Sequence, residues 1–389
     1  MFPARRTTAA VTPRGLLASA LAALALVGVT ATAVAATPGR SADSPLGSPV
    51  TCRHGIGVPV ALAPGQPTAY TISGELCSTA AERHRGAMVQ LLIPGATYTH
   101  DYWDFGVVDD IRYSYARTVA ADGIATFAID PLGTGASSRP ASRKITAQAD
   151  AFVAHQLVQA LRDGTIAGIG FGTVIEVGHS LSSLIAWDEA IAYHDVDGVI
   201  VTGVAHSLAA AFGKAFGAGL YPAADDPRFA GTVLDAGYLT TVPGSRGTLF
   251  YHQPSADPAV IALDEARKDV VPGTELNTAL PVVTNTATRA IDVPVLDLLG
   301  GDDFTTCGLS TQGHVFDCST GAAVAAQEAP FYSPAAQIHA CVIPGSGHDI
   351  SLALNSGLQA ADAIAWSDTF VAHHRTGPHG ARRLPFDCG

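Results

Sequence analysis

Residues 174–190, Val-Ile-Glu-Val-Gly-His-Ser-Leu-Ser-Ser-Leu-Ile-Ala-Trp-Asp-Glu-Ala, decide the fold, because an apolar strand runs directly into a helix through one serine. Residues 178–182 differ at one position from G-x-S-x-G, a sharp strand-to-helix turn that lifts a serine hydroxyl clear of a sheet. The residues two before and two after that serine must be small, since the strand and the helix collide otherwise. Gly178 meets this condition, and Ser182 stands where glycine is usual. The stretch therefore predicts a strained backbone and an accessible hydroxyl at Ser180.

Apolar strand patterns and helical patterns alternate on both sides of this stretch. Because each strand is apolar almost throughout, the alternation predicts an α/β fold whose parallel sheet is covered by helices on both faces. The predicted strands are 58–63, 68–72, 87–93, 124–129, 173–177, 199–204, 293–299 and 339–343, and the predicted helices are 113–121, 147–162, 181–194 and 357–372.

The alternation stops between residues 208 and 290, which are rich in Gly, Pro and short helical pieces such as 259–268. An insertion between two core strands is the natural place for a lid or cap over a substrate pocket. We therefore predict a cap at 208–290 that divides a core made of residues 51–207 and 291–389.

The N-terminus has the pattern of a targeting segment. A basic start is followed by an apolar stretch at 16–29 and by small residues at 33–36, so residues 1–36 are predicted to be a signal peptide that is removed on export. A membrane anchor is the alternative, although the stretch is barely long enough to span a bilayer. Arg5-Arg6 raises the twin-arginine route, but the residues that should follow such a pair are missing, which favours general secretion. Residues 37–50 are a Pro/Gly/Ser-rich linker.

The composition restricts the partners. Hydrophobic residues make up 48% of the 389-residue chain and charged residues 14%, which suits a well-buried fold and argues against disorder. The net charge of −12 argues against nucleic acid and anionic membrane surfaces as partners. We expect a monomer without a stable membrane anchor after signal removal.

Six cysteines lie beyond the predicted cleavage site, and an even count in an exported chain predicts disulfides. Six cysteines allow 15 pairings, of which we favour the sequence-local ones, Cys52–Cys77, Cys307–Cys318 and Cys341–Cys388. A zinc site is the competing hypothesis, but the chain has no close Cys-x-x-Cys pair.

A serine hydroxyl needs a neighbouring imidazole to become a nucleophile, and the imidazole needs a carboxylate to fix its tautomer. In a fold with this turn the partners follow in the order Ser, acid, His, in loops at the carboxyl ends of late strands. Strand 293–299 leads to Asp302 and Asp303, and strand 339–343 leads to a Gly-flanked His348. We predict Asp303 as the acid, with Asp302 as the alternative, and His348 as the base.

The oxyanion of acyl transfer needs preorganised N–H donors. One is expected from Leu181, which follows the serine. The other is expected from the loop after strand 87–93, where Gly95 permits a bend that would aim the N–H of Ala96 into a pocket, with Thr97 as the alternative. A plain Pro-Gly turn is the competing interpretation of this loop.

Five segments together resemble the α/β-hydrolase fold superfamily, and the resemblance spans roughly residues 85–372, weakest across 208–290. The chain looks like a secreted, capped member of the kind common in high-GC Gram-positive bacteria. The resemblance implies an eight-stranded, mostly parallel sheet and a triad of Ser180, Asp303 and His348. Two positions depart from the pattern: Pro94 replaces the usual histidine of the oxyanion loop, and Ser182 replaces glycine. The segments are 94–97 (Pro-Gly-Ala-Thr), 130–138 (Asp-Pro-Leu-Gly-Thr-Gly-Ala-Ser-Ser), 178–182, 300–303 (Gly-Gly-Asp-Asp) and 345–348 (Gly-Ser-Gly-His).

The predicted function is a secreted serine hydrolase that cleaves small-molecule or lipid-like carboxylic esters through an acyl-enzyme, with no metal or organic cofactor. The alternatives are an amide or peptide hydrolase with the same triad, and a non-catalytic binding protein on this scaffold. Asp109-Asp110 and Asp225-Asp226 hint at calcium, but solvated surface carboxylates explain them better. Apolar side chains of the cap would form either an acyl pocket or the cap's own core: Phe212, Phe216, Leu220, Tyr221, Tyr238, Phe250 and Tyr251.

Overall fold

The structure is a computed structural model that describes residues 49–80, 84, 86–372, 386 and 388. The predicted signal peptide and residues 37–48 of the predicted linker lie outside these residues.

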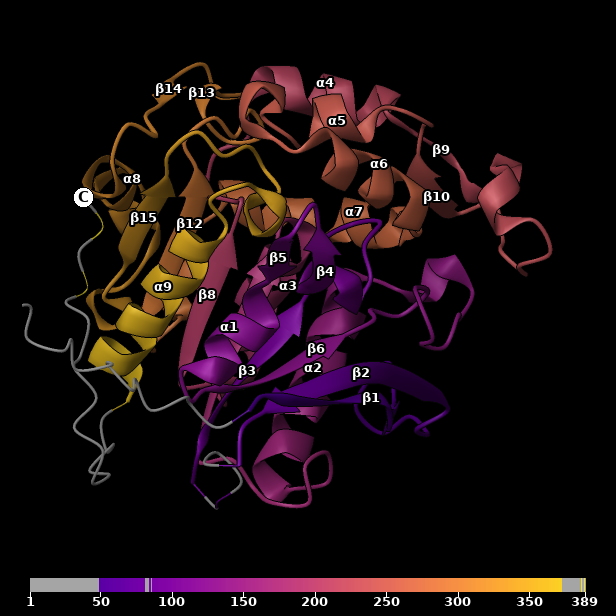
Figure 1. The fold of residues 1–389 in the computed structure, drawn as a ribbon, viewed down its shortest axis with the longest axis vertical. Helices are drawn as coiled ribbons and strands as arrows, with labels where there is room; N and C mark the ends of the chain where they lie inside the picture. Colours follow the sequence, from indigo (N-terminus) through magenta and orange to yellow (C-terminus); the bar gives the residue numbers. More distant parts are fainter. Residues whose placement is uncertain (1–48, 81–83, 85, 373–385, 387, 389) are drawn as a thin grey trace, which may run out of the picture. The chain divides into compact units, whose positions relative to one another are not determined.

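An eight-stranded sheet lies at the centre of the described chain (Figure 1). Its first two pairings, β1 with β2 and β2 with β6, are antiparallel, and every pairing from β6 to β15 is parallel. The predicted fold class, a mostly parallel eight-stranded sheet flanked by helices, is confirmed. In spatial order the strands are β1 (Thr51–Val60), β2 (Tyr70–Ser78), β6 (Ala125–Ile129), β3 (Met88–Ile93), β7 (Thr173–His179), β8 (Gly198–Thr202), β12 (Val295–Gly300) and β15 (His339–Ile343).

Helices cover both faces of the sheet because the strands are apolar on both sides. α2 (Ala147–Asp163) and α3 (Leu181–Tyr193) contribute to one apolar cluster, whereas α1 (Tyr115–Ala121) and α9 (Gly357–Trp366) contribute to the other (Figure 1). α8 (Gly321–Glu328) lies next to the edge strand β15. The start and end of α2 follow from its sequence, since the Thr146 hydroxyl accepts from the N–H of Ala149 and Gly164 ends the helix at φ 88°.

Several elements differ from the sequence prediction. The strands predicted at 58–63 and 68–72 are β1 at Thr51–Val60 and β2 at Tyr70–Ser78. The helix predicted at 113–121 begins only at Tyr115, because residues before it form a hairpin of β4 (Asp104–Val108) and β5 (Ile111–Ser114). Asp109 and Asp110 make its two-residue turn at φ 47° and 66°. The second residue pair proposed for calcium also has a structural explanation, since Asp226 accepts from Lys268 at 2.9 Å.

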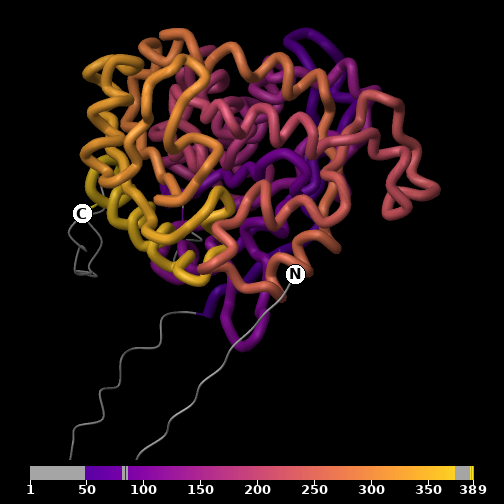
Figure 2. The backbone as a smooth tube through the Cα atoms, turned by 90° about the horizontal axis from the view of Figure 1, so that it is seen from above, coloured from indigo at the N-terminus to yellow at the C-terminus, as the bar shows by residue number. Residues whose placement is uncertain are grey.

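Residues 208–290 run between β8 and β12 and belong to the same compact unit as the sheet. They reach the loops that follow β15 and β3: the N–H of Asp349 donates to the Phe250 carbonyl (3.0 Å), and that of Asp269 to the Thr97 carbonyl (2.8 Å). The stretch after β9 projects away from the sheet in both views (Figures 1 and 2). The main elements here are α4 (Ala210–Ala218), β9 (Leu220–Pro222), β10 (Tyr238–Thr241), α5 (Arg246–Leu249), α6 (Pro258–Arg267), β11 (Val271–Pro272) and α7 (Gly273–Ala279), with β11, β10 and β9 forming a small sheet.

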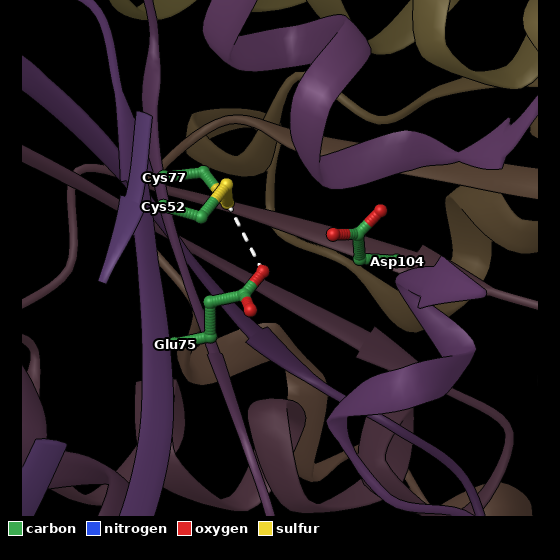
Figure 3. Close-up of side chains that lie close together, drawn as sticks. All are labelled: Cys52, Glu75, Cys77 and Asp104. Carbon is green, nitrogen blue, oxygen red and sulfur yellow. Dashed lines mark hydrogen bonds between the residues drawn. A yellow bond between two sulfur atoms is a disulfide. The ribbon is translucent and has the colours of Figure 1, made fainter. Parts of the chain in front are cut away.

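The six cysteines form the three expected disulfides, Cys52–Cys77, Cys307–Cys318 and Cys341–Cys388. The first joins β1 to β2, and its Cys77 Sγ lies 3.1 Å from Glu75 Oε1, with Asp104 nearby (Figure 3). Because the paired cysteines carry no free thiolate, the competing zinc hypothesis loses its sulfur ligands.

Candidate active site

The turn between β7 and α3 has the strained geometry that the sequence predicts. Ser180 sits at φ 53° and ψ −120°, a region that non-glycine residues rarely adopt. A Cβ at Gly178 would collide with the backbone of Ser182, so glycine is required there. A Cβ at Gly95 would lie 3.0 Å from the Ser180 Cβ, so the loop after β3 packs directly on the serine.

The two departures from the family motif touch each other. The Ser182 hydroxyl, which is buried, donates to the Pro94 carbonyl at 2.6 Å. The hydroxyl therefore fastens the first turn of α3 to the loop expected to hold the oxyanion.

His348 lies between Ser180 and Asp303. Its Nε2 is 2.8 Å from Ser180 Oγ, and its Nδ1 is 3.0 Å from Asp303 Oδ2. Asp303 is fully buried, and its other oxygen accepts from the N–H of Thr305 at 2.8 Å. The alternative acid, Asp302, is 47% exposed, and its carboxylate lies 3.6 Å from Nδ1 of His252. The structure thus brings together the serine, the predicted acid and the predicted base.

Space for the imidazole comes from a residue that the sequence did not single out. Gly203 follows β8 at φ 71°, and a Cβ there would lie 2.9 Å from Cε1 of His348. Gly203 lies in no sequence motif, so its role in making room for the imidazole could not be predicted from the sequence.

Two histidines in the site have opposite pKa shifts. Burial alone would lower the pKa of His348, but the charge of Asp303 outweighs it and holds the pKa above 6.5. Burial and the nearby His348 hold the pKa of His179 well below 6.5, so His179 is neutral. His179 stacks on Tyr102 with ring centroids 4.3 Å apart and lies 2.9 Å from the Thr202 hydroxyl, which suits a supporting role.

The loop predicted to supply the second oxyanion donor is fixed from several sides. Thr97 takes φ 67°, and the N–H of Tyr98 closes a turn onto the Gly95 carbonyl (3.2 Å). Among the residues that the structure describes, the N–H groups of Ala96 and Leu181 find no hydrogen-bond acceptor. Both donors are thus available beside Ser180.

A buried arginine ties this loop to residues 208–290. Arg246 makes a two-pronged ion pair with Asp264 (2.8 and 2.9 Å), and its third nitrogen donates to the Thr97 hydroxyl at 2.7 Å. Its guanidinium also lies 4.2 Å from the ring centre of Tyr98 and 5.1 Å from that of Phe250. Sequence analysis missed this group because its members are far apart in the chain.

Asp349, next to the imidazole, extends the same network. Its carboxylate accepts a short hydrogen bond from Tyr98 and lies 3.3 Å from Nε2 of His179. Burial raises the pKa of Asp349 to about 6 even though His348 and Arg246 act to lower it. The loop that carries the imidazole is therefore held by charged groups as well as by packing.

Aromatic rings border the imidazole on the side of residues 208–290. The ring centres of Phe212 and Phe250 lie 6.3 and 5.9 Å from that of His348, and Phe304 packs edge-on against Phe212. Two other aromatics of the segment face elsewhere. Tyr251 donates to Asp264 at 2.9 Å, and Tyr238 donates to the Pro140 carbonyl at 2.6 Å.

No helix within the described residues is long and apolar enough to span a bilayer.

Comparison with known proteins identifies the family. The model of the alpha/beta hydrolase family matches residues 90–365, which is most of the chain. The chain therefore belongs to the alpha/beta hydrolase family, a family of hydrolases. A search of curated proteins found no match.

Solved structures agree on the fold. An esterase from Thermogutta terrifontis is 17% identical, with a TM-score of 0.53 over 81% of this chain and 98% of that one. A soluble variant of monoglyceride lipase from Saccharomyces cerevisiae is also 17% identical, with a TM-score of 0.53 over 79% and 94%. An esterase from Exiguobacterium antarcticum is 12% identical, with a TM-score of 0.54 over 81% and 100%.

Proposed function

We propose that the protein is a secreted serine hydrolase that cleaves carboxylic esters with Ser180, His348 and Asp303. The observation that carries the proposal is the pair of contacts from Ser180 Oγ to His348 (2.8 Å) and from His348 to Asp303 (3.0 Å). Such a relay is what an unactivated hydroxyl needs to attack a carbonyl at neutral pH.

Each residue has one role in the proposed reaction. Ser180 Oγ attacks the ester carbonyl carbon while Nε2 of His348 takes its proton. The imidazolium, stabilised by Asp303, then donates that proton to the departing alcohol oxygen and leaves an acyl-Ser180. Water repeats the two steps, releases the carboxylic acid and restores the hydroxyl.

The oxyanion of both tetrahedral intermediates would accept from the N–H groups of Ala96 and Leu181. Their lack of acceptors and the packing of Gly95 on Ser180 support this role. One such donor typically contributes about 10²–10³ in rate.

Residues 208–290 would act as the cap, and their rings at Phe212 and Phe250 would border an apolar acyl group of a small-molecule or lipid-like ester. We propose that the cap completes a core of residues 51–207 and 291–389, and that the protein acts as a monomer without nucleic acid.

Export is part of the proposal. Residues 1–36 would be removed as a signal peptide, leaving 37–50 as a linker. Three disulfides support an oxidising destination, because such bonds are rare in the reducing cytosol.

Labelling with a fluorophosphonate tests the proposal. Wild type should take one label, peptide mass spectrometry should place it on Ser180, and Ser180→Ala should stay unlabelled. A panel of matched p-nitrophenyl esters and p-nitroanilides then separates ester from amide hydrolysis. An unlabelled wild type, or equal labelling of the variant, would contradict the assignment.

A further inference from the structure

An acidic cluster lies under α3, away from the candidate active site. It consists of Glu176 on β7, Glu189 on α3, Asp195 in the loop that follows, and His155 on α2. The ligand atoms of His155, Glu189 and Asp195 all lie within 4.8 Å of one another. The carboxyl group of Glu189 is also within hydrogen-bonding reach of Glu176, so it lies between two other acids.

The carboxyl oxygens of this cluster have no donors. Glu176 and Glu189 are both fully buried, and among the described residues no N–H group and no hydroxyl donates to their four oxygens, which contact only other carboxyl groups of the cluster. Oδ1 of Asp195 is likewise buried without a partner. Buried carboxylates are found paired or bound to metal ions, because an isolated charge in the protein interior costs several kcal/mol.

Nearby groups do not supply the missing positive charge. Arg162, the arginine on the same helix as His155, donates instead to the carbonyl of Asp195 and, at 2.7 Å, to the carboxylate of Asp197. His155 Nδ1 lies 2.7 Å from Asp195 Oδ2, which also accepts from Gln159. These contacts reach one oxygen of Asp195 and leave the two glutamates facing each other.

We propose that His155, Glu189 and Asp195 bind one divalent cation of the Zn²⁺ class, with Glu176 beside Glu189 as a neighbouring acid. One imidazole nitrogen and two carboxylates suit Zn²⁺, which occurs with three such protein ligands and a fourth position open to water. Calcium takes six to eight oxygen ligands and is a poorer match for this set. The cation would take the place of the donor that Glu189 lacks.

The site would stabilise α3, the helix that follows the turn at Ser180. Glu176 lies four residues before Ser180 on β7, about 13 Å along the strand. Bound metal would join α2, α3 and the loop after α3, would lie beside Glu176 of β7, and would not touch the reacting atoms. The inference is independent of the proposed ester hydrolysis.

The other groups of potential ligands differ in kind. Two of them contain cysteines that are closed as disulfides, Cys52–Cys77 and Cys341–Cys388. Glu275 is a separate buried acid that lies near the half-buried Asp150, so Glu275→Gln is a matched control for loss of a buried carboxylate.

Calorimetric titration of the untagged chain, stripped with EDTA, tests the proposal with Zn²⁺ as the probe. Wild type should bind one Zn²⁺, confirmed by metal content after desalting. Glu189→Gln should weaken the affinity at least about tenfold, since even outer partners of metal ligands cost 10–100-fold. Glu275→Gln should bind as wild type does.

A second variant guards against misfolding. His155 stacks on Tyr193 and on Phe152, with ring centroids 4.3 and 5.9 Å away, so His155→Phe keeps the packing and removes the nitrogen. It should also lose at least about tenfold in Zn²⁺ affinity. Absence of stoichiometric Zn²⁺ in wild type, equal affinity in both ligand variants, or tighter binding of Ca²⁺ than Zn²⁺ would overturn the proposal.

Discussion

Replacing Arg246 with methionine should destabilise the fold strongly, because the change strands a buried acid. Arg246 is fully buried, and Met keeps most of its apolar stem while removing the guanidinium. Asp264, only 1% exposed, would keep its charge and lose both prongs of the ion pair. Breaking a buried pair from one side costs about 3–5 kcal/mol, whereas removing both charges costs much less. We therefore expect about 3–5 kcal/mol for Arg246→Met and about 1–2 kcal/mol for Arg246→Met/Asp264→Asn.

The pH dependence of the variant's stability distinguishes an unpaired buried carboxylate from lost packing as the cause of destabilisation. Burial raises the pKa of Asp264, and Arg246 acts to lower it. Without Arg246 the pKa of folded Asp264 rises further above its unfolded value of about 3.9, so the folded state binds more protons than the unfolded one. The stability of the variant relative to wild type should therefore fall by up to about 1.4 kcal/mol per pH unit as the pH rises through that window.

Urea unfolding followed by tryptophan fluorescence measures these differences, since Trp103, Trp187 and Trp366 are all buried. The activity readout is independent. Loss of the donor to Thr97 frees the oxyanion loop, so kcat should fall about tenfold, less than the 10²–10³ of a lost oxyanion donor. A loss of less than about 1 kcal/mol at pH 7.5, or a loss that does not change between pH 5 and 8, would refute the reasoning.

Four further predictions follow from the site and the core. Ser180→Ala and His348→Ala should each lower kcat by about 10⁴ or more in an ester assay, while exposed Asp302→Asn should stay near wild type. Because the base must be neutral and the pKa of His348 is raised, kcat/KM should reach half its maximum above pH 6.5; a midpoint below 6 would contradict the role of Asp303. Ser182→Ala leaves the Pro94 carbonyl without its donor, so urea unfolding should show a loss of about 1–3 kcal/mol and kinetics a lower kcat at similar KM. Burial raises the pKa of Asp150 and, with the charge of Asp150, that of Glu275, so the folded state holds extra protons and stability should fall as pH rises above about 4.5; Glu275→Gln should flatten that slope in urea midpoints, and an unchanged slope would count against it.

The local pattern of apolar residues was sufficient to predict the positions of the central strands. The predicted strands at 87–93, 124–129 and 339–343 match β3, β6 and β15 within one residue. Strands buried on both faces are continuous apolar runs, and turn residues mark their ends. The same reasoning predicts that Ser180, Asp303 and His348 lie close together, because the carboxyl ends of parallel strands share one edge of the sheet.

Local pattern failed where the backbone adopts an uncommon conformation. The hairpin before α1 turns through Asp109 and Asp110, both at positive φ. Two-residue hairpin turns favour Asn-Gly or Asp-Gly there, so Asp-Asp gives no hairpin signal. The tyrosine-rich stretch after it was therefore assigned to a helix two residues too early.

Polar contacts between residues far apart in the chain could not be predicted from the sequence. Arg246 contacts Thr97, which is 149 residues away, and Asp264, which lies on another helix. In the sequence, Arg246 cannot be told apart from the exposed arginines of other Gly/Pro-rich segments. The structure shows that Arg246 is buried and paired, and burial of its charge without a partner would cost too much free energy.

The geometry of the turn between β7 and α3 explains why the chain tolerates serine at 182, where its family motif has glycine. The steric limit falls on Gly178, whose Cβ would meet the backbone of the first turn of α3. The Ser182 side chain points instead to the Pro94 carbonyl, which it meets at 2.6 Å. Ser182 therefore gives the loop after β3 a donor from the first turn of α3, which glycine could not supply. Since that donor lies beside the reacting serine, glycine at 182 should restore the motif and yet loosen the loop.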